Sequence, residues 1–197
     1  MSNTEVVDVF LHYLSSKISL SDAELDQIRT VSIVKKLRKK QYLLQEGDVW
    51  RYHAFVADGF LRTFSVDEKS NEHIMNFSPE NYWTGDRASL SSGNPSRFYI
   101  EALEDSAVVL ITDQNFQGLC KRIPQLNELV NAILHRSFIV SQDRIHSSIA
   151  LSAEEKYHHF LEKYPGISNR VPQHMIASFI GVTPETLTRI RRNSTKK

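Results

Sequence analysis

Three arginines, Arg189, Arg191 and Arg192, lie close together near the end of the chain. Apolar residues recur around them at helical spacing from Ile176 to Ile190, which leaves the arginines on another face. Guanidinium groups exposed on one side of a helix attract the phosphates of nucleic acid and can donate hydrogen bonds to bases. The alternative is an ordinary helical hairpin with a basic end. The spacing of the preceding residues favours DNA binding.

Those preceding residues have the spacing of a helix-turn-helix. Gly181 interrupts the apolar run and Thr183-Pro184 restarts it, because a threonine hydroxyl can cap a new helix and proline is tolerated at its first position. Ala177 lies four residues before the glycine, and Leu187 lies six residues after it. Two helices that meet within about three residues need a small residue, a turn glycine and a shared apolar residue. The sequence therefore predicts a DNA-binding helix pair near its end.

The composition is that of a soluble globular protein, with 41% hydrophobic and 24% charged residues in 197. No apolar run is long enough to span a membrane, and the acidic N-terminal stretch lacks a secretory signal, so we expect a cytoplasmic protein without membrane contact. The single cysteine, Cys120, excludes an internal disulfide and a cysteine-based metal cluster. Residues 149–197 hold eight Lys or Arg and four Asp or Glu, against sixteen and nineteen in residues 1–148. This basic excess agrees with DNA binding by the helix pair.

Between about residues 31 and 111 the apolar residues alternate with a period of two. Short strands separated by turn residues are typical of an antiparallel sandwich or jelly roll. Asp58-Gly59 is the strongest hairpin signal, because both residues tolerate the backbone of a tight turn. The basic run 35–40 alternates with apolar residues, which favours a solvated strand face over a nucleic-acid patch. The predicted strands include His53–Ala57, Phe60–Val66, His73–Phe77, Arg97–Leu103 and Ala107–Ile111.

Helices are predicted on both sides of these strands. Two short helices precede the strands, and a third, over Asp113–Arg122, follows them. The next helix, Gln125–Leu151, contains no proline or glycine and is too long to be buried against one small barrel. Its apolar stripe either packs on the barrel or pairs with the same helix of a second chain, and we expect a homodimer. The predicted stripe comprises Leu126, Val130, Ile133, Leu134, Ser137 and Val140.

The predicted fold class is α+β, with an N-terminal antiparallel jelly-roll barrel, a long dimerisation helix and a small helix-turn-helix domain. We expect these parts in residues 1–122, 123–150 and 151–197. This arrangement resembles the Crp/Fnr family of bacterial transcription regulators, which couple a cyclic-nucleotide-binding-like barrel to a winged helix-turn-helix. The most specific match is IASFIGVTPETLTRIRR, in which Gly181, Thr183, Glu185 and Arg189 follow the family's pattern. A second similarity, to the early barrel hairpins of the family, involves Gly47-Asp48, Phe55-Val56, Gly59 and Arg62.

The resemblance implies a homodimer that binds a palindromic site in double-stranded DNA and acts with RNA polymerase. It also implies that Glu185 and Arg189 read base edges, and the chemistry agrees, since glutamate can accept from cytosine and arginine can bridge two acceptors of guanine. The two residues share one helix face, so an intrahelical ion pair is an alternative that can coexist with base contacts. Candidate phosphate contacts are Thr183, Thr186, Arg191 and Arg192, and Pro184 and Thr188 complete the predicted DNA-binding set.

The effector site of the family matches this sequence less well. In nucleotide-binding members, a glycine-glutamate pair and an arginine some ten residues later hold the ribose and the cyclic phosphate. Here Asp86 stands in place of the glutamate and Ser96 in place of the arginine, while a one-residue shift along a strand would send Arg97 to the opposite face. The cysteine cluster of oxygen-sensing members is missing too. We therefore expect an unidentified effector or none, in preference to a cyclic nucleotide, and no certain cofactor or metal. The candidate pocket comprises Gly85, Asp86, Arg87, Ser96 and Arg97.

Family members usually continue beyond the recognition helix into a hairpin wing, whereas only five residues follow Arg192. The sequence therefore predicts a truncated wing, with Lys196 and Lys197 as weak substitutes at phosphates. Two other functions share parts of this pattern. A ligand-sensing adaptor without DNA binding would keep the barrel, but the helix retains every residue type that DNA contact needs. A cupin-like enzyme would share the jelly roll, but His53 and His73 lack partners at metal-ligand spacing, so we expect no enzyme activity.

Overall fold

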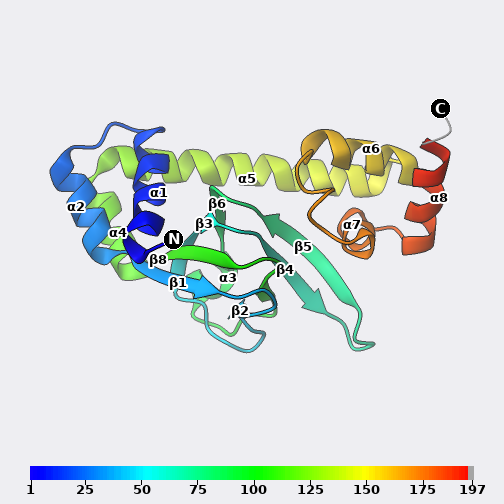
Figure 1. Ribbon diagram of the computed structural model, residues 1–197, viewed down its shortest axis with the longest axis horizontal. Helices are drawn as coiled ribbons and strands as arrows, with labels where there is room; N and C mark the ends of the chain where they lie inside the picture. Colours follow the sequence, from blue (N-terminus) through cyan, green and yellow to red (C-terminus); the bar gives the residue numbers. More distant parts are fainter. Residues whose placement is uncertain (195–197) are drawn as a thin grey trace.

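The computed structural model describes residues 1–194, which form a barrel of strands with helices at both ends and one long helix alongside (Figure 1). The chain starts with α1 (Asn3–Ser15) and α2 (Asp22–Val31). Both helices begin with a capping box, in which a serine hydroxyl and a glutamate side chain each accept a hydrogen bond from the other residue's backbone N–H. The two boxes are Ser2–Glu5 and Ser21–Glu24.

The strands form two four-stranded antiparallel sheets, ordered β1-β8-β3-β6 and β2-β7-β4-β5. The first sheet contains β1 (Ile33–Leu37), β3 (Tyr52–Asp58), β6 (Tyr82–Thr84) and β8 (Ser106–Thr112). The second contains β2 (Tyr42–Leu44), β4 (Leu61–Val66), β5 (Glu72–Ser78) and β7 (Tyr99–Ala102). Buried residues of both sheets join in one apolar cluster, including Val56 and Val108 of the first and Leu61 and Ile100 of the second. The predicted antiparallel barrel is confirmed.

The predicted hairpin at Asp58-Gly59 is wrong. Strands β3 and β4 flank this turn, but β3 pairs with β6 and β8 while β4 pairs with β5 and β7. The chain therefore passes here from one sheet to the other. Gly59 has a φ of +87°, and a Cβ at this position would lie 2.3 Å from Ser106 Oγ and 2.5 Å from the Asp105 carbonyl oxygen. Glycine is needed because another turn passes so close to it.

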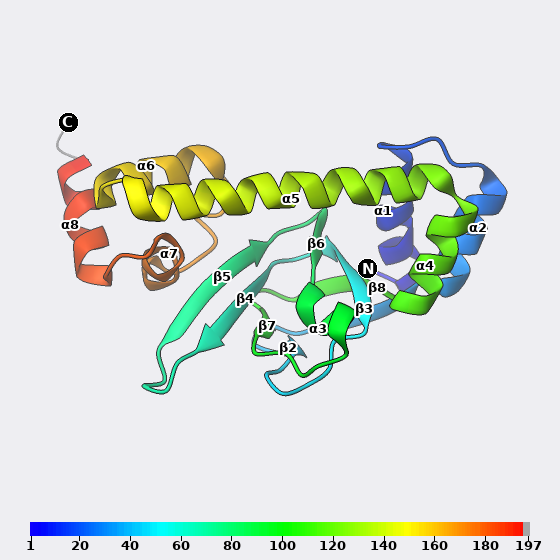
Figure 2. The ribbon, with the colours of Figure 1, turned by 180° about the vertical axis from the view of Figure 1, so that it is seen from behind.

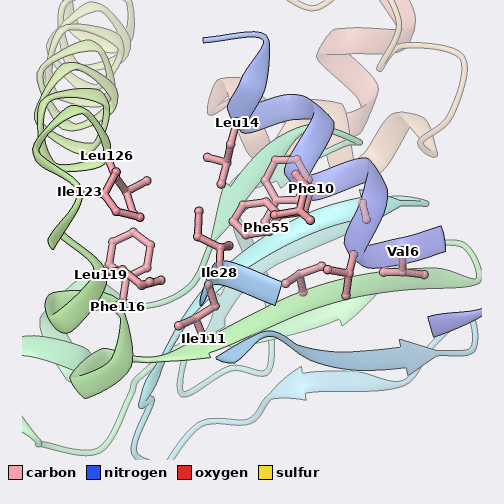
Figure 3. Packing of buried hydrophobic residues seen from close by; sticks show 14 of the residues in the cluster. Val6, Phe10, Leu14, Ile28, Phe55, Ile111, Phe116, Leu119, Ile123 and Leu126 are labelled. Carbon is pink, nitrogen blue, oxygen red and sulfur yellow. The ribbon is translucent and has the colours of Figure 1, made fainter. Parts of the chain in front are cut away.

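Helices α1, α2 and α4 (Asp113–Arg122) contribute to one apolar cluster with residues of the first sheet (Figure 3). Phe10 of α1 contacts Phe55 of β3 with 4.9 Å between ring centroids, and Phe116 of α4 belongs to the same cluster. Leu126 also lies there, at the start of α5 (Pro124–Ala150). The long helix is therefore anchored to the barrel at its N-terminal end.

From this anchor α5 runs the length of the molecule to α6 (Ala153–Lys163), α7 (Gln173–Ile180) and α8 (Pro184–Ser194), as Figures 1 and 2 show. These three helices lie at the end opposite α1 and α2. Helix α6 also begins with a capping box, formed by Ser152 and Glu155. None of the helices in residues 1–194 has the length and apolarity needed to cross a membrane. The same residues include no cluster of three or more His, Cys, Asp or Glu that could hold a metal ion.

Candidate nucleic-acid interface

Helices α7 and α8 meet in the predicted tight turn. Gly181 ends α7 with a φ of +71°, in the left-handed region that glycine tolerates best. The Val182 N–H donates to the Ala177 carbonyl at 2.9 Å, which closes the turn. Thr183 Oγ1 then accepts from the Thr186 backbone N–H at 3.2 Å, so the threonine caps α8 and Pro184 occupies its first position. Local chemistry thus sets the angle at which α8 leaves α7.

Helix α8 has one buried face and one exposed face. Leu187 and Ile190 are buried in a cluster that also contains Ala177, which is fully buried on α7. The exposed side chains are Pro184, Glu185, Thr188, Arg189, Arg191 and Arg192, with Thr183 exposed just before the helix and Thr186 half-buried. A shallow surface hollow is lined by Pro184, Glu185, Thr188, Arg189 and Arg192. These five of the predicted DNA-binding residues therefore share one accessible side of the helix, whereas Thr186 and Arg191 are not part of that lining. Lys196 and Lys197 lie outside the described residues.

The Glu185 carboxylate, at the start of α8, is stabilised in its ionised form. Hydrogen bonds from the backbone N–H of Glu185 and from the Thr183 hydroxyl lower the pKa of the Glu185 carboxyl. Glutamate is therefore ionised near neutral pH and can only accept hydrogen bonds, as contact with a base amine requires. The intrahelical ion pair with Arg189 is not among the salt bridges of the described chain. Thr188 Oγ1 donates to the Pro184 carbonyl at 2.9 Å, which leaves its methyl group and lone pairs for other contacts.

The candidate effector pocket is closed by its own side chains. A short helix, α3 (Arg87–Ser92), follows β6, and Asp86 caps it by accepting from the backbone N–H groups of Ala88 at 2.9 Å and Ser89 at 3.2 Å. The other carboxylate oxygen of Asp86 accepts from Ser96 Oγ at 2.8 Å, and both residues are buried. The carboxylate therefore already occupies the place where these donors could hold an anion.

The remaining pocket residues do not join this pair. Arg87 and Arg97 are exposed, and Arg97 lies over the ring of Phe98 at 5.6 Å. Gly85 has a φ of +138°, and a Cβ there would lie 2.6 Å from the indole nitrogen of Trp50, so the tryptophan packs directly against the backbone. The structure thus joins Asp86 and Ser96 by a hydrogen bond, while the side chains of Arg87 and Arg97 are exposed.

The exposed apolar face of α5 differs from the predicted stripe. Leu126 is buried and Val130 packs against the same N-terminal cluster, so this part of the stripe contacts the chain's own barrel. Ile133, Leu134 and Val140 are half-buried, and Ser137 is exposed. The large apolar side chains left exposed are Phe138 (60%), Ile145 (61%) and Ile149 (80%), together with Ile139 (49%). The first three recur seven and four residues apart and therefore share one helix face.

Sequence reasoning missed two arginines that join the C-terminal helices to the barrel. In the sequence, Arg144 falls within the otherwise largely apolar stripe of α5, and Arg170 lies in the segment between α6 and α7. In the structure Arg144 contacts β5 and α7, and Arg170 pairs with Glu80 and Glu104. For Arg144, its position as a cation inside an apolar stripe was the one sequence signal of a buried contact. No sequence feature identified its partners, because those lie far along the chain.

Comparison with known proteins agrees with this architecture. Residues 34–123 match the model of the cyclic nucleotide-binding domain family. The structure resembles that of FixK2 from Bradyrhizobium japonicum (TM-score 0.73, 18% identity, 84% of this chain and 85% of the other). It also resembles the c-di-GMP responsive global regulator CLP from Xanthomonas campestris (TM-score 0.73, 10% identity, 89% and 92%). At these identities the likeness establishes the fold.

Similarity to curated proteins extends over nearly the whole chain. An anaerobic regulatory protein of Pasteurella multocida is 25% identical over 93% of this chain and 71% of its own length. The fumarate and nitrate reduction regulatory protein of Escherichia coli is also 25% identical, over 93% and 77%. In its barrel, long helix and helix-turn-helix, the chain is therefore similar over nearly its whole length to transcription regulators of the Crp/Fnr type.

Proposed function

We propose that the protein regulates transcription as a homodimer that binds a two-fold symmetric DNA site through α8. The observation that carries the proposal is the exposed side of α8, where Glu185, Thr188 and Arg189 lie together while Leu187 and Ile190 anchor the helix from behind. An ionised glutamate and an arginine four residues apart suit adjacent C·G and G·C pairs in the major groove. The arginines that follow suit phosphates on either side.

The proposed dimer uses the face of α5 that carries Phe138, Ile145 and Ile149. Side chains of this size on one helix face favour pairing with the same helix of a second copy. Two copies related by a two-fold axis along α5 would carry both α8 helices at the same end, as a palindromic site requires. Such a regulator acts on chromosomal DNA in the cytoplasm, and RNA polymerase is its proposed protein partner.

The effector is the open part of the proposal. The bonded pair of Asp86 and Ser96 supports a barrel that takes no cyclic nucleotide, because the buried donors are already satisfied. The proposed regulator therefore responds to an effector other than a cyclic nucleotide, or to none.

Selection from a pool of random DNA duplexes, followed by fluorescence anisotropy on the selected site, tests DNA binding. Arg189→Ala should lose discrimination at one base pair, by about 1–3 kcal/mol. Arg191→Ala should weaken binding to all sequences and reduce the slope of log affinity against log salt concentration by about one. Arg136→Ala, which removes one exposed charge from α5, is the matched control. A wild-type protein indifferent to DNA at low salt would favour the adaptor function and end the proposal.

A further inference from the structure

The C-terminal helices share their apolar core with the barrel. Phe179 of α7 contacts Phe77 of β5 with 5.2 Å between ring centroids, and it contacts Phe160 of α6 at 5.7 Å. The buried residues of α6, α7 and α8 form one cluster with Phe60 and Phe64 of the barrel. The second sheet therefore serves as a wall of the helix-turn-helix unit, and the placement of α8 depends on how firmly that wall is held.

Strand β5 is an edge of the second sheet, and α7 contacts this edge through a serine. Ser178 Oγ accepts from the Ile74 backbone N–H at 3.0 Å and donates to the Glu72 carbonyl at 3.0 Å. It thereby satisfies two groups of the strand that lack a neighbouring strand. This pair of bonds fixes α7 along the strand direction.

Arg144 joins the long helix to both partners. Its guanidinium group lies over the ring of Phe179 at 4.2 Å and donates to the Met75 carbonyl and, at 3.4 Å, to the Phe179 carbonyl. Burial lowers the pKa of this arginine, and none of the ion pairs formed within residues 1–194 includes it. One side chain of α5 thus holds the barrel edge and the first helix of the DNA-binding pair.

Arg170 holds the segment between α6 and α7 against two barrel turns. It donates to both carboxylate oxygens of Glu80 at 2.8 Å, and to Glu104 at 3.0 and 2.7 Å. Its guanidinium group also lies 4.5 Å from the ring centroid of Phe60. Hydrogen bonds to the two glutamates raise the pKa of Arg170, and the same arginine lowers the pKa of Glu80. A planar group bound by two carboxylates has little freedom to rotate.

We propose that Arg144, Arg170 and Ser178 are positioning residues for DNA recognition, because they fix the orientation of α8 relative to α5. The inference rests on the proposed function, in which α5 pairs the two copies. In such a dimer the orientation of α8 relative to α5 sets the separation of the two α8 helices. Rigid contacts therefore make binding sensitive to the distance between the half-sites, and loosened contacts make it tolerant of that distance.

The test measures affinity for three duplexes: the selected site, the same site with two base pairs inserted at its centre, and a single half-site. For the wild type, the insertion should cost on the order of 100-fold in affinity, since simultaneous binding of both half-sites is lost. Arg170→Gln should keep the half-site affinity and reduce the insertion penalty to less than about tenfold. Glu80→Gln combined with Glu104→Gln removes both carboxylate charges that face Arg170 from the barrel side and should change the insertion penalty in the same direction. Arg136→Gln is the matched control and should behave as wild type.

Amide hydrogen exchange supplies a second readout that needs no DNA. In Arg170→Gln, residues 164–180 should exchange faster while α1 stays protected. The positioning role would be overturned if Arg170→Gln and the double glutamate variant both kept the wild-type insertion penalty. It would also be overturned if residues 164–180 exchanged at the same rate in Arg170→Gln as in the wild type. Equal losses on all three duplexes would assign the contacts to folding alone and would also overturn it. A wild-type protein that binds none of the duplexes refutes the proposed function, which is a different result.

Discussion

Replacing Phe179 by alanine should destabilise the barrel as well as the helices that carry the mutation. Phe179 is 7% exposed, and its ring contacts Phe77 of the barrel, Phe160 and Tyr164 of the C-terminal helices, and Arg144 of α5. Truncating such a buried ring costs about 3–5 kcal/mol, because contacts are lost and a cavity remains. This is a large share of a total stability of about 5–15 kcal/mol.

Urea unfolding followed by two probes gives the measurement. Both tryptophans, Trp50 and Trp83, lie in the barrel, so their fluorescence reports the barrel, whereas circular dichroism also reports α6–α8. For a slope of about 2–3 kcal/mol/M, the loss corresponds to a midpoint shift of about 1–2.5 M urea. Because the barrel and the helices share a core, both probes should shift together. All variants are compared at one protein concentration, since a dimer's stability depends on it.

Thr188→Ala, an exposed change on α8, is the control and should change the free energy of unfolding by less than about 0.5 kcal/mol. The result that would refute this reasoning is a fluorescence midpoint unaffected by Phe179→Ala, together with an early loss of helical signal. The C-terminal helices would then fold as a separate unit, and the contacts across Phe77 would contribute nothing to the barrel.

Other perturbations have equally definite expected results. Phe138→Glu, on the exposed face of α5, should give a particle of 22.7 kDa in sedimentation at micromolar concentration, and a persistent dimer would contradict the proposed interface. Burial lowers the pKa of His53 below its ordinary value of 6.5, so the unfolded chain binds the proton more readily and stability falls as pH decreases below 6.5. His53→Gln should reduce this fall in stability between about pH 7.5 and 5. If the wild type and the variant lost stability equally over this range, His53 would not be the group responsible. Saturating cyclic AMP should not raise the melting temperature, because Asp86 already occupies the donors of α3; a clear rise would contradict the closed pocket.

The helix-turn-helix could be predicted because its signals are local. Gly181 sets a left-handed turn, and Thr183-Pro184 start a helix whatever surrounds them. The strands and long helices were predictable for the same reason. Each is indicated by the spacing of its apolar residues and by turn residues within a few positions along the chain. The short helix α3 was missed because six residues show no periodicity.

Features that depend on distant parts of the chain could not be predicted in this way. Turn residues at Asp58-Gly59 indicate a change of direction but not which strand β4 will pair with. Helix α5 carries apolar side chains on more than one face, and periodicity does not say which face meets the barrel. The sequence places Ser96 where nucleotide-binding members of the family have an arginine, but its bond to Asp86 depends on the fold around α3.

The bonds between Ser178 and β5 have a consequence for solubility. An open sheet edge offers unpaired N–H and C=O groups to any other extended chain and is a site for aggregation. Here α7 covers that edge at Glu72 and Ile74, and the same packing covers the apolar ring of Phe77. A protein cut before α7 would therefore expose both, and we expect it to self-associate through β5 instead of persisting as a soluble sensor barrel. The helix that orients α8 also protects the barrel from other copies of itself.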